Sequence, residues 1–119
     1  MPLVTAAMAS DKLTGTYGGD RVNATFGASG ARLDFDCAVA EIDGAVLPGS
    51  DGRFVARGRY LADHPGPIAG DTAARAVAAV FEGRLAGDTL QLKILLQGKP
   101  DMKVLTLVRG RRVKLVRCL

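Results

Sequence analysis

The sequence predicts an all-β protein: a compact antiparallel β-barrel of up-and-down or meandering order with about eight strands. Apolar and polar residues alternate along most of the chain, which is typical of strands with one buried face. Turn-forming stretches rich in Gly, Asp and Pro separate these segments every ten residues or so. Because neighbouring segments are joined by short turns, we expect the sheet to close on itself, which removes its unpaired edges.

The first half of the chain carries the clearest alternation. Strands are predicted over residues 12–17, 21–26, 31–37, 38–42 and 53–60. In the third of these, Leu33 and Phe35 share one face with Cys37, while Asp34 and Asp36 take the other. This phase predicts that Cys37 points into the core.

The second half continues the same pattern after its longest interruption, residues 61–75, where Pro65 and Pro67 prevent continuous strand pairing. Strands are predicted over residues 76–85, 89–96, 102–109 and 112–118. Gly87-Asp88 is a two-residue hairpin turn, and Gly110 centres a final hairpin. Residues 72–80 have a helical composition, so a short helix is the alternative there.

Length and composition predict one domain over residues 12–119. The chain has 119 residues, of which 48% are hydrophobic. Residues 1–11 are small and apolar but lack the positive region of an intact signal peptide. They are expected to be a disordered terminus or the remainder of a trimmed leader. No apolar run approaches the ~20 residues of a membrane-spanning helix.

The charge pattern disfavours a nucleic-acid partner. The formal net charge is only +4 and 5% of residues are aromatic, whereas base-stacking surfaces combine dense positive charge with aromatic rings. The basic residues of the last eleven positions are expected to lie on a solvated hairpin face. Asp34 and Asp36 on one strand, and Arg57 and Arg59 on another, are expected to form cross-strand ion pairs.

No catalytic or metal-binding motif stands out, so we expect neither a metal nor a cofactor. His64 is the only histidine, and the serines lie in predicted turns without a nucleophile motif. Cys37 and Cys118 are too far apart in sequence for a CxxC motif. They are either two independent buried thiols or one disulfide that ties the end of the chain to its middle.

Several segments resemble a family of small exported bacterial β-barrel proteins. The matching segments are GTYGGDRV (15–22), LDFDCA (33–38), GRFVARGRY (52–60), HPGP (64–67), FEGRLAGDTLQLKI (81–94) and LVRGRRVKLVRCL (107–119). Tyr17 stands where the family carries Trp, and Pro65 where it carries Gly. The resemblance implies export to the periplasm or the medium, and it favours pairing of Cys37 with Cys118. It implies no particular activity.

The predicted function is that of a non-enzymatic binding or interaction module, either monomeric or homodimeric. The expected contact surface is the 61–75 loop and the adjacent rim, with Tyr60, His64, Pro65 and Pro67 as binding residues. The partner is either a small apolar ligand in the barrel or a protein. Two alternatives are a periplasmic inhibitor of a protease or lysozyme-type enzyme, and a small hydrolase that uses His64.

Overall fold

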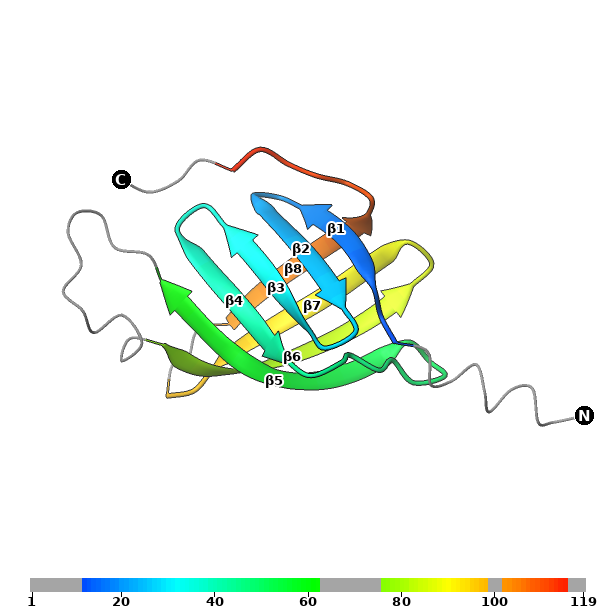
Figure 1. The fold of residues 1–119 in the computed structure, drawn as a ribbon, viewed down its shortest axis with the longest axis horizontal. Helices are drawn as coiled ribbons and strands as arrows, with labels where there is room; N and C mark the ends of the chain where they lie inside the picture. The colour runs from blue at the N-terminus through cyan, green and yellow to red at the C-terminus, as the bar shows by residue number, and fades with distance from the viewer. Residues whose placement is uncertain (1–11, 63–75, 99–101, 116–119) are drawn as a thin grey trace, which may run out of the picture.

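The computed structural model describes residues 12–62, 76–98 and 102–115, and over these residues the chain is a closed antiparallel β-barrel of eight strands (Figure 1). The all-β prediction is therefore confirmed, and no helix occurs in the described ranges. The strands are β1 (Gly15–Gly19), β2 (Val22–Gly27), β3 (Gly30–Phe35), β4 (Ala38–Asp43), β5 (Arg53–Ala62), β6 (Val77–Ala86), β7 (Thr89–Leu96) and β8 (Met102–Arg109). The predicted helix alternative over 72–80 is wrong for its described residues, because residue 76 is not helical and residues 77–80 belong to β6.

Each strand pairs with the next along the chain, and the barrel closes where β1 meets β8. That last pairing is short and joins Tyr17 to Arg109 and Gly18 to Val108. The backbones approach closely here: a Cβ on Gly18 would lie 2.2 Å from the carbonyl oxygen of Arg111. The seam therefore requires a glycine on β1, because any side chain would push the two segments apart.

Apolar side chains from all eight strands fill the interior, as the alternating pattern predicts. The largest fully buried side chains are Tyr17, Phe81, Leu33, Leu90, Leu92, Ile94, Leu107 and Val22. The ring of Phe54 lies against Gly83, its neighbour on β6, where a Cβ would come within 2.2 Å of the ring. The Phe54 ring thus fills the space that Gly83 leaves by having no side chain. Such complementary sizes allow a small barrel to reach the packing density of a protein core.

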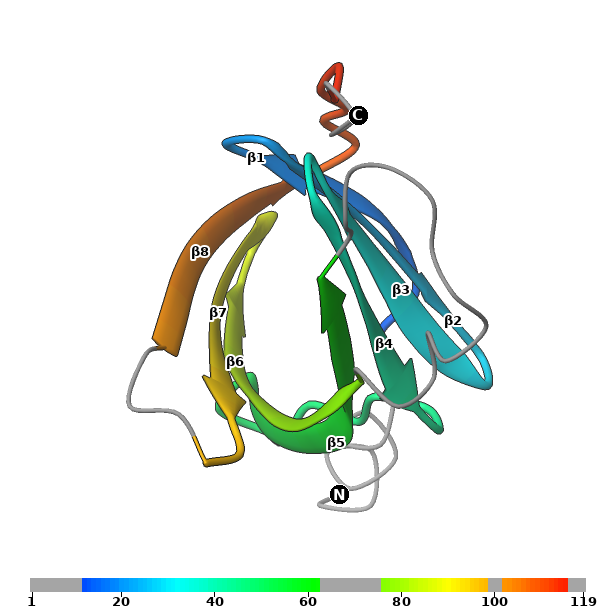
Figure 2. The same cartoon turned by 90° about the vertical axis from the view of Figure 1, so that its left-hand side faces the viewer.

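The two ends of the barrel differ. One end is covered by the connection between β4 and β5, where Val46 is only 2% exposed and its carbonyl accepts a 2.8 Å hydrogen bond from the Leu13 N–H. The other end carries the β1–β2 turn, the β3–β4 turn, the end of β5 and the start of β8. Figure 2 shows the strands arranged around this second end, where the described residues form only short turns, and which is called the open end below.

Two expectations about the chain near the open end are wrong. Residues 111–115 form no strand, because the edge of β8 that a further strand would need is already paired with β1. Cys37 is exposed rather than buried, since β3 ends at Phe35 and the chain bends at Asp36 and Cys37 before β4 begins. Apolar and polar residues alternate in facing only within one straight strand, so the alternation does not predict burial across this bend.

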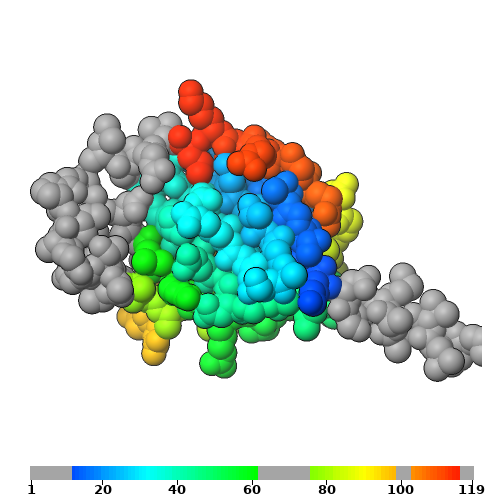
Figure 3. Space-filling view, viewed as in Figure 1, coloured from blue at the N-terminus to red at the C-terminus, as the bar shows by residue number. Residues whose placement is uncertain are grey.

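Residues 111–115, called the C-terminal segment below, cross the outside of the barrel instead. The side-chain amide of Asn23 on β2 binds the backbone of Val113 twice. Its Nδ2 donates to the Val113 carbonyl at 2.8 Å, and its Oδ1 accepts from the Val113 N–H at 2.9 Å. In Figure 3 the orange and red residues lie against the blue and cyan strands along one edge of the molecule. The asparagine therefore mimics a paired backbone and fixes the direction of the segment.

Candidate binding site at the open end

A hollow of about 430 Å³ opens at the open end of the barrel and is called the mouth below. Four parts of the chain line it: the β1–β2 turn, the β3–β4 turn with Phe35, Tyr60 of β5, and residues 103–105 of β8. These parts are far apart in the sequence and are brought together only by closure of the sheet. The mouth is therefore a product of the fold rather than of one loop.

Two aromatic rings and one ammonium group meet in the mouth. The Phe35 and Tyr60 rings lie edge to face, with centroids 6.0 Å apart and planes at 61°. The Lys103 Nζ lies 5.5 Å from the Tyr60 centroid and 6.0 Å from that of Phe35. At these distances the ammonium is attracted to the negative faces of the rings, an effect worth about 0.5–1 kcal/mol at an exposed site.

Lys103 stands at an inward-facing position of β8. It pairs with the buried Ile94 in the register of β7 and β8, and it lies on the same strand face as Leu105 and the fully buried Leu107. A lysine at such a position is unusual, because its ammonium must stay near water. Here the half-buried stem continues the core and the ammonium reaches the mouth.

Ion pairs around the mouth involve Arg21 rather than Lys103 among the described residues. Arg21 of the β1–β2 turn forms an ion pair with Asp36 of the β3–β4 turn, which holds the two turns together. Within the described ranges, no carboxylate forms an ion pair with Lys103. Asp20, Arg21, Asp36 and Lys103 all line the mouth, and Lys103 is the cation that lies beside the two ring faces. This pairing of an ammonium with aromatic rings suits an anionic group on an apolar or aromatic body.

Of the predicted contact residues, Tyr60 lies in the mouth. His64, Pro65 and Pro67 lie outside the described residues, as do Cys118 and residues 1–11. The hydrolase hypothesis depends on His64 and stays a prediction. Phe35 and Lys103 were not predicted as site residues, although the phase shared by Lys103, Leu105 and Leu107 already puts a charge on an apolar strand face.

The predicted ion pairing on the outer face is found for Arg59. Its guanidinium lies 2.9 Å from the Asp43 carboxylate and 3.6 Å from that of Glu41, its neighbour on β4. Asp34 pairs within its own strand, with Arg32 at 2.9 Å. These exposed pairs are structural.

Tyr17 is the one buried side chain with an unpaired polar atom among the described residues. Its hydroxyl is buried and has no hydrogen-bond partner. The Arg109 guanidinium lies 5.0 Å from the ring centroid, and Phe26 packs edge-on at 5.7 Å. Burial raises the pKa of Tyr17 above its usual value, which Arg109 partly opposes. The hydroxyl is therefore neutral and adds no charge to the core.

In the parts of the chain that the structure describes, no group of three or more His, Cys, Asp or Glu side chains is placed to hold a metal ion. No helix long and apolar enough to cross a membrane is found over those same residues. Comparison of the chain with protein-family models, curated proteins and solved structures finds no match. The geometry of the mouth is therefore the main indication of function.

Proposed function

We propose that the chain is an exported, non-enzymatic binding module whose ligand enters the mouth. The observation that carries this proposal is Lys103, a cation at an inward-facing position whose ammonium lies over the rings of Phe35 and Tyr60 in the mouth. The ligand class that this chemistry favours is a carboxylate, sulfonate or similar anion joined to an aromatic or apolar group. The acidic group contacts the ammonium and the apolar part covers the rings.

Binding at the mouth is favoured over binding deep in the barrel. Tyr17, Leu33, Phe81 and Leu92 fill the middle of the interior and are at most 1% exposed. An eight-stranded barrel is just wide enough for such side chains to fill it. A ligand in the lumen would have to displace them, whereas a ligand in the mouth contacts groups that are already half exposed.

We also propose that Cys37 and Cys118 form a disulfide, in keeping with export. Two observations support it: Cys37 is exposed, and residues 112 and 115 of the C-terminal segment line the same hollow as Asp36 and Ala38, which flank Cys37. The chain thus heads toward Cys37 three residues before Cys118. Closing so long a loop stabilises the folded chain by roughly 4–5 kcal/mol in the chain-entropy model.

Alkylation followed by mass measurement tests the disulfide. Protein recovered from an oxidising compartment and denatured without reductant is expected to take up no iodoacetamide, because both thiols are in the bond. After reduction it is expected to take up a group on each of Cys37 and Cys118. Alkylation of both cysteines without reductant would contradict the proposal.

A fluorescence titration with 8-anilinonaphthalene-1-sulfonate tests the mouth, since this probe joins a sulfonate to aromatic rings. We expect saturable binding that Lys103→Gln weakens about tenfold, the loss of one charge-assisted contact. The matched control is Lys12→Gln, which removes the same charge at the covered end, and its Kd should stay within about twofold of wild type. Equal affinities of wild type and Lys103→Gln, or no saturable binding, would overturn the proposal.

A further inference from the structure

The outer face of β5–β8 carries a cross-strand row that does not fit a solvated surface. Val55 pairs with Glu82, Glu82 with Lys93, and Lys93 with Val104, so these four residues form one line across four strands. Val55 is 70% exposed and Val104 is 65% exposed. Outward positions of an antiparallel sheet are ordinarily polar. Two solvent-exposed valines therefore flank one acidic and one basic residue in this row.

A second row of outward residues lies beside the first and is displaced from it by two residues on each strand. Arg53 pairs with Arg84, Arg84 with Gln91, and Gln91 with Thr106. Like charges directly opposite each other on neighbouring strands are destabilising. Asp51 lies 3.8 Å from Arg53 and offsets part of that charge. No carboxylate of the described residues forms an ion pair with Arg84.

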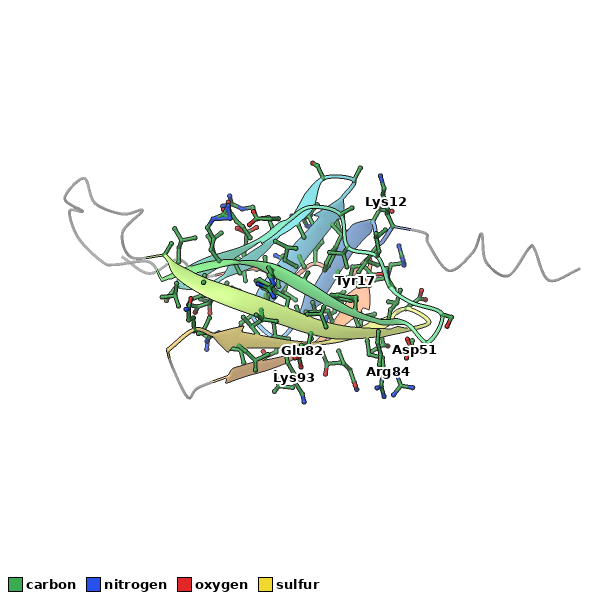
Figure 4. The ribbon with its side chains drawn as sticks, turned by 90° about the horizontal axis from the view of Figure 1, so that it is seen from below. Lys12, Tyr17, Asp51, Glu82, Arg84 and Lys93 are labelled. Atoms are coloured by element: carbon green, nitrogen blue, oxygen red, sulfur yellow. The ribbon has the colours of Figure 1, made fainter. Side chains whose placement is uncertain are left out.

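The two rows line a shallow hollow of about 740 Å³, called the outer groove below. Four strands spaced about 4.8 Å apart make it about 14 Å across, and the rows lie about 7 Å apart. In Figure 4 the side chains of Glu82, Arg84 and Lys93 lie on the outside of the same part of the barrel, while Tyr17 lies inside. The outer groove therefore lies on the outside of the barrel, and it shares only Val104 with the lining of the mouth.

We propose that the outer groove binds an acidic, partly apolar segment of a partner protein in extended conformation. Its acidic side chains would lie over Arg84 and Arg53, and its apolar side chains would cover Val55 and Val104. The groove lining carries three cations and one carboxylate, so charge complementarity selects an acidic partner. The polar side chains of Gln91 and Thr106 supply hydrogen-bonding groups to such a chain.

Other occupants fit the outer groove less well. A second copy of this chain placed face to face would set the positive lining against itself, and like charges that face each other across an interface oppose binding. A flat lipid surface would not reach into a hollow, whereas an extended peptide can lie along it. The proposal does not depend on the ligand of the mouth.

Fluorescence anisotropy tests the proposal with a short fluorescein-labelled peptide in which aspartate and leucine alternate. We expect saturable binding that Arg84→Glu weakens about tenfold or more, because a cation over the acidic side chains becomes an anion. The matched control is Arg111→Glu, the same charge change on the C-terminal segment, which should stay within about threefold of wild type. Val55→Thr, which keeps the shape of the side chain, should weaken binding several-fold.

The competing outcomes are separable. If Arg84→Glu and Arg111→Glu bind alike, or if the peptide does not bind, the proposal is wrong. If Lys103→Gln abolishes peptide binding and Arg84→Glu does not, the peptide occupies the mouth. The outer groove proposal is then wrong, while the proposal for the mouth stands. Binding to phosphatidylglycerol vesicles without peptide binding, or a concentration-dependent dimer that Val55→Thr dissociates in sedimentation, would also overturn it.

Discussion

Replacing Asn23 by alanine tests whether the C-terminal segment is held by one side chain. The Asn23 amide makes two hydrogen bonds to Val113, at 2.8 and 2.9 Å, both partly buried. Each such bond contributes about 0.5–1.5 kcal/mol net, so the pair contributes about 1–3 kcal/mol. We expect Asn23→Ala to lower the free energy of unfolding by about 2 kcal/mol, because the C-terminal segment loses both hydrogen bonds to this side chain of β2.

Two measurements check this expectation under non-reducing conditions. Urea unfolding followed by circular dichroism gives the change in free energy, and hydrogen exchange gives the protection of the Val113 amide. The control is Thr25→Ala, the next outward position of β2, which is exposed and should change stability by less than about 0.5 kcal/mol. If Asn23→Ala leaves both the unfolding free energy and the Val113 protection unchanged, the two hydrogen bonds do not hold the segment.

Further predictions concern the core and the barrel seam. Tyr17→Phe removes a buried, unpaired hydroxyl and should raise the free energy of unfolding by about 1 kcal/mol in a urea titration; a loss of stability would show that the hydroxyl is satisfied. Because burial raises the folded pKa of Tyr17, ionisation of its hydroxyl destabilises the folded chain. The stability linked to the protonated form is complete below the unfolded pKa of about 10 and is lost as pH rises through the folded pKa. Wild type should therefore lose more stability than Tyr17→Phe in alkaline urea titrations, and equal losses would exclude this cause. Gly18→Ala should cost about 1–3 kcal/mol, because its Cβ would meet the backbone of the C-terminal segment 2.2 Å away, and thermal unfolding should show it. Gly27→Ala is the control, since its nearest atom is 3.8 Å away.

Most of the barrel could be predicted from the sequence because one rule, alternation with a period of two, governs every strand. Leu33, Leu90 and Leu92 are buried as their phase predicts. The rule fails where the chain turns, so the burial of Cys37 was predicted wrongly. It also fails after Gly110, because pairing depends on whether β8 still has a free edge, and only the closed barrel determines that.

The candidate site was predictable only in part. Tyr60 follows from its place at the end of a long strand before the 61–75 interruption. The partners of Tyr60 in the mouth do not, because Phe35 and Lys103 reach it through closure of strands that are far apart in sequence. The outer groove could not be predicted from the sequence for the same reason. Val55 and Val104 come into one row only through the pairing register of four strands.

The most direct test of the account maps the binding surface by amide chemical shifts. A ¹H–¹⁵N correlation titration with 8-anilinonaphthalene-1-sulfonate should shift the amides of Phe35, Ala38, Tyr60 and Lys103, which line the mouth. The amides of Leu33 and Phe81, in the filled interior, should stay in place. Shifts concentrated on the interior amides, with the mouth unaffected, would contradict both the filled barrel and the proposed binding site.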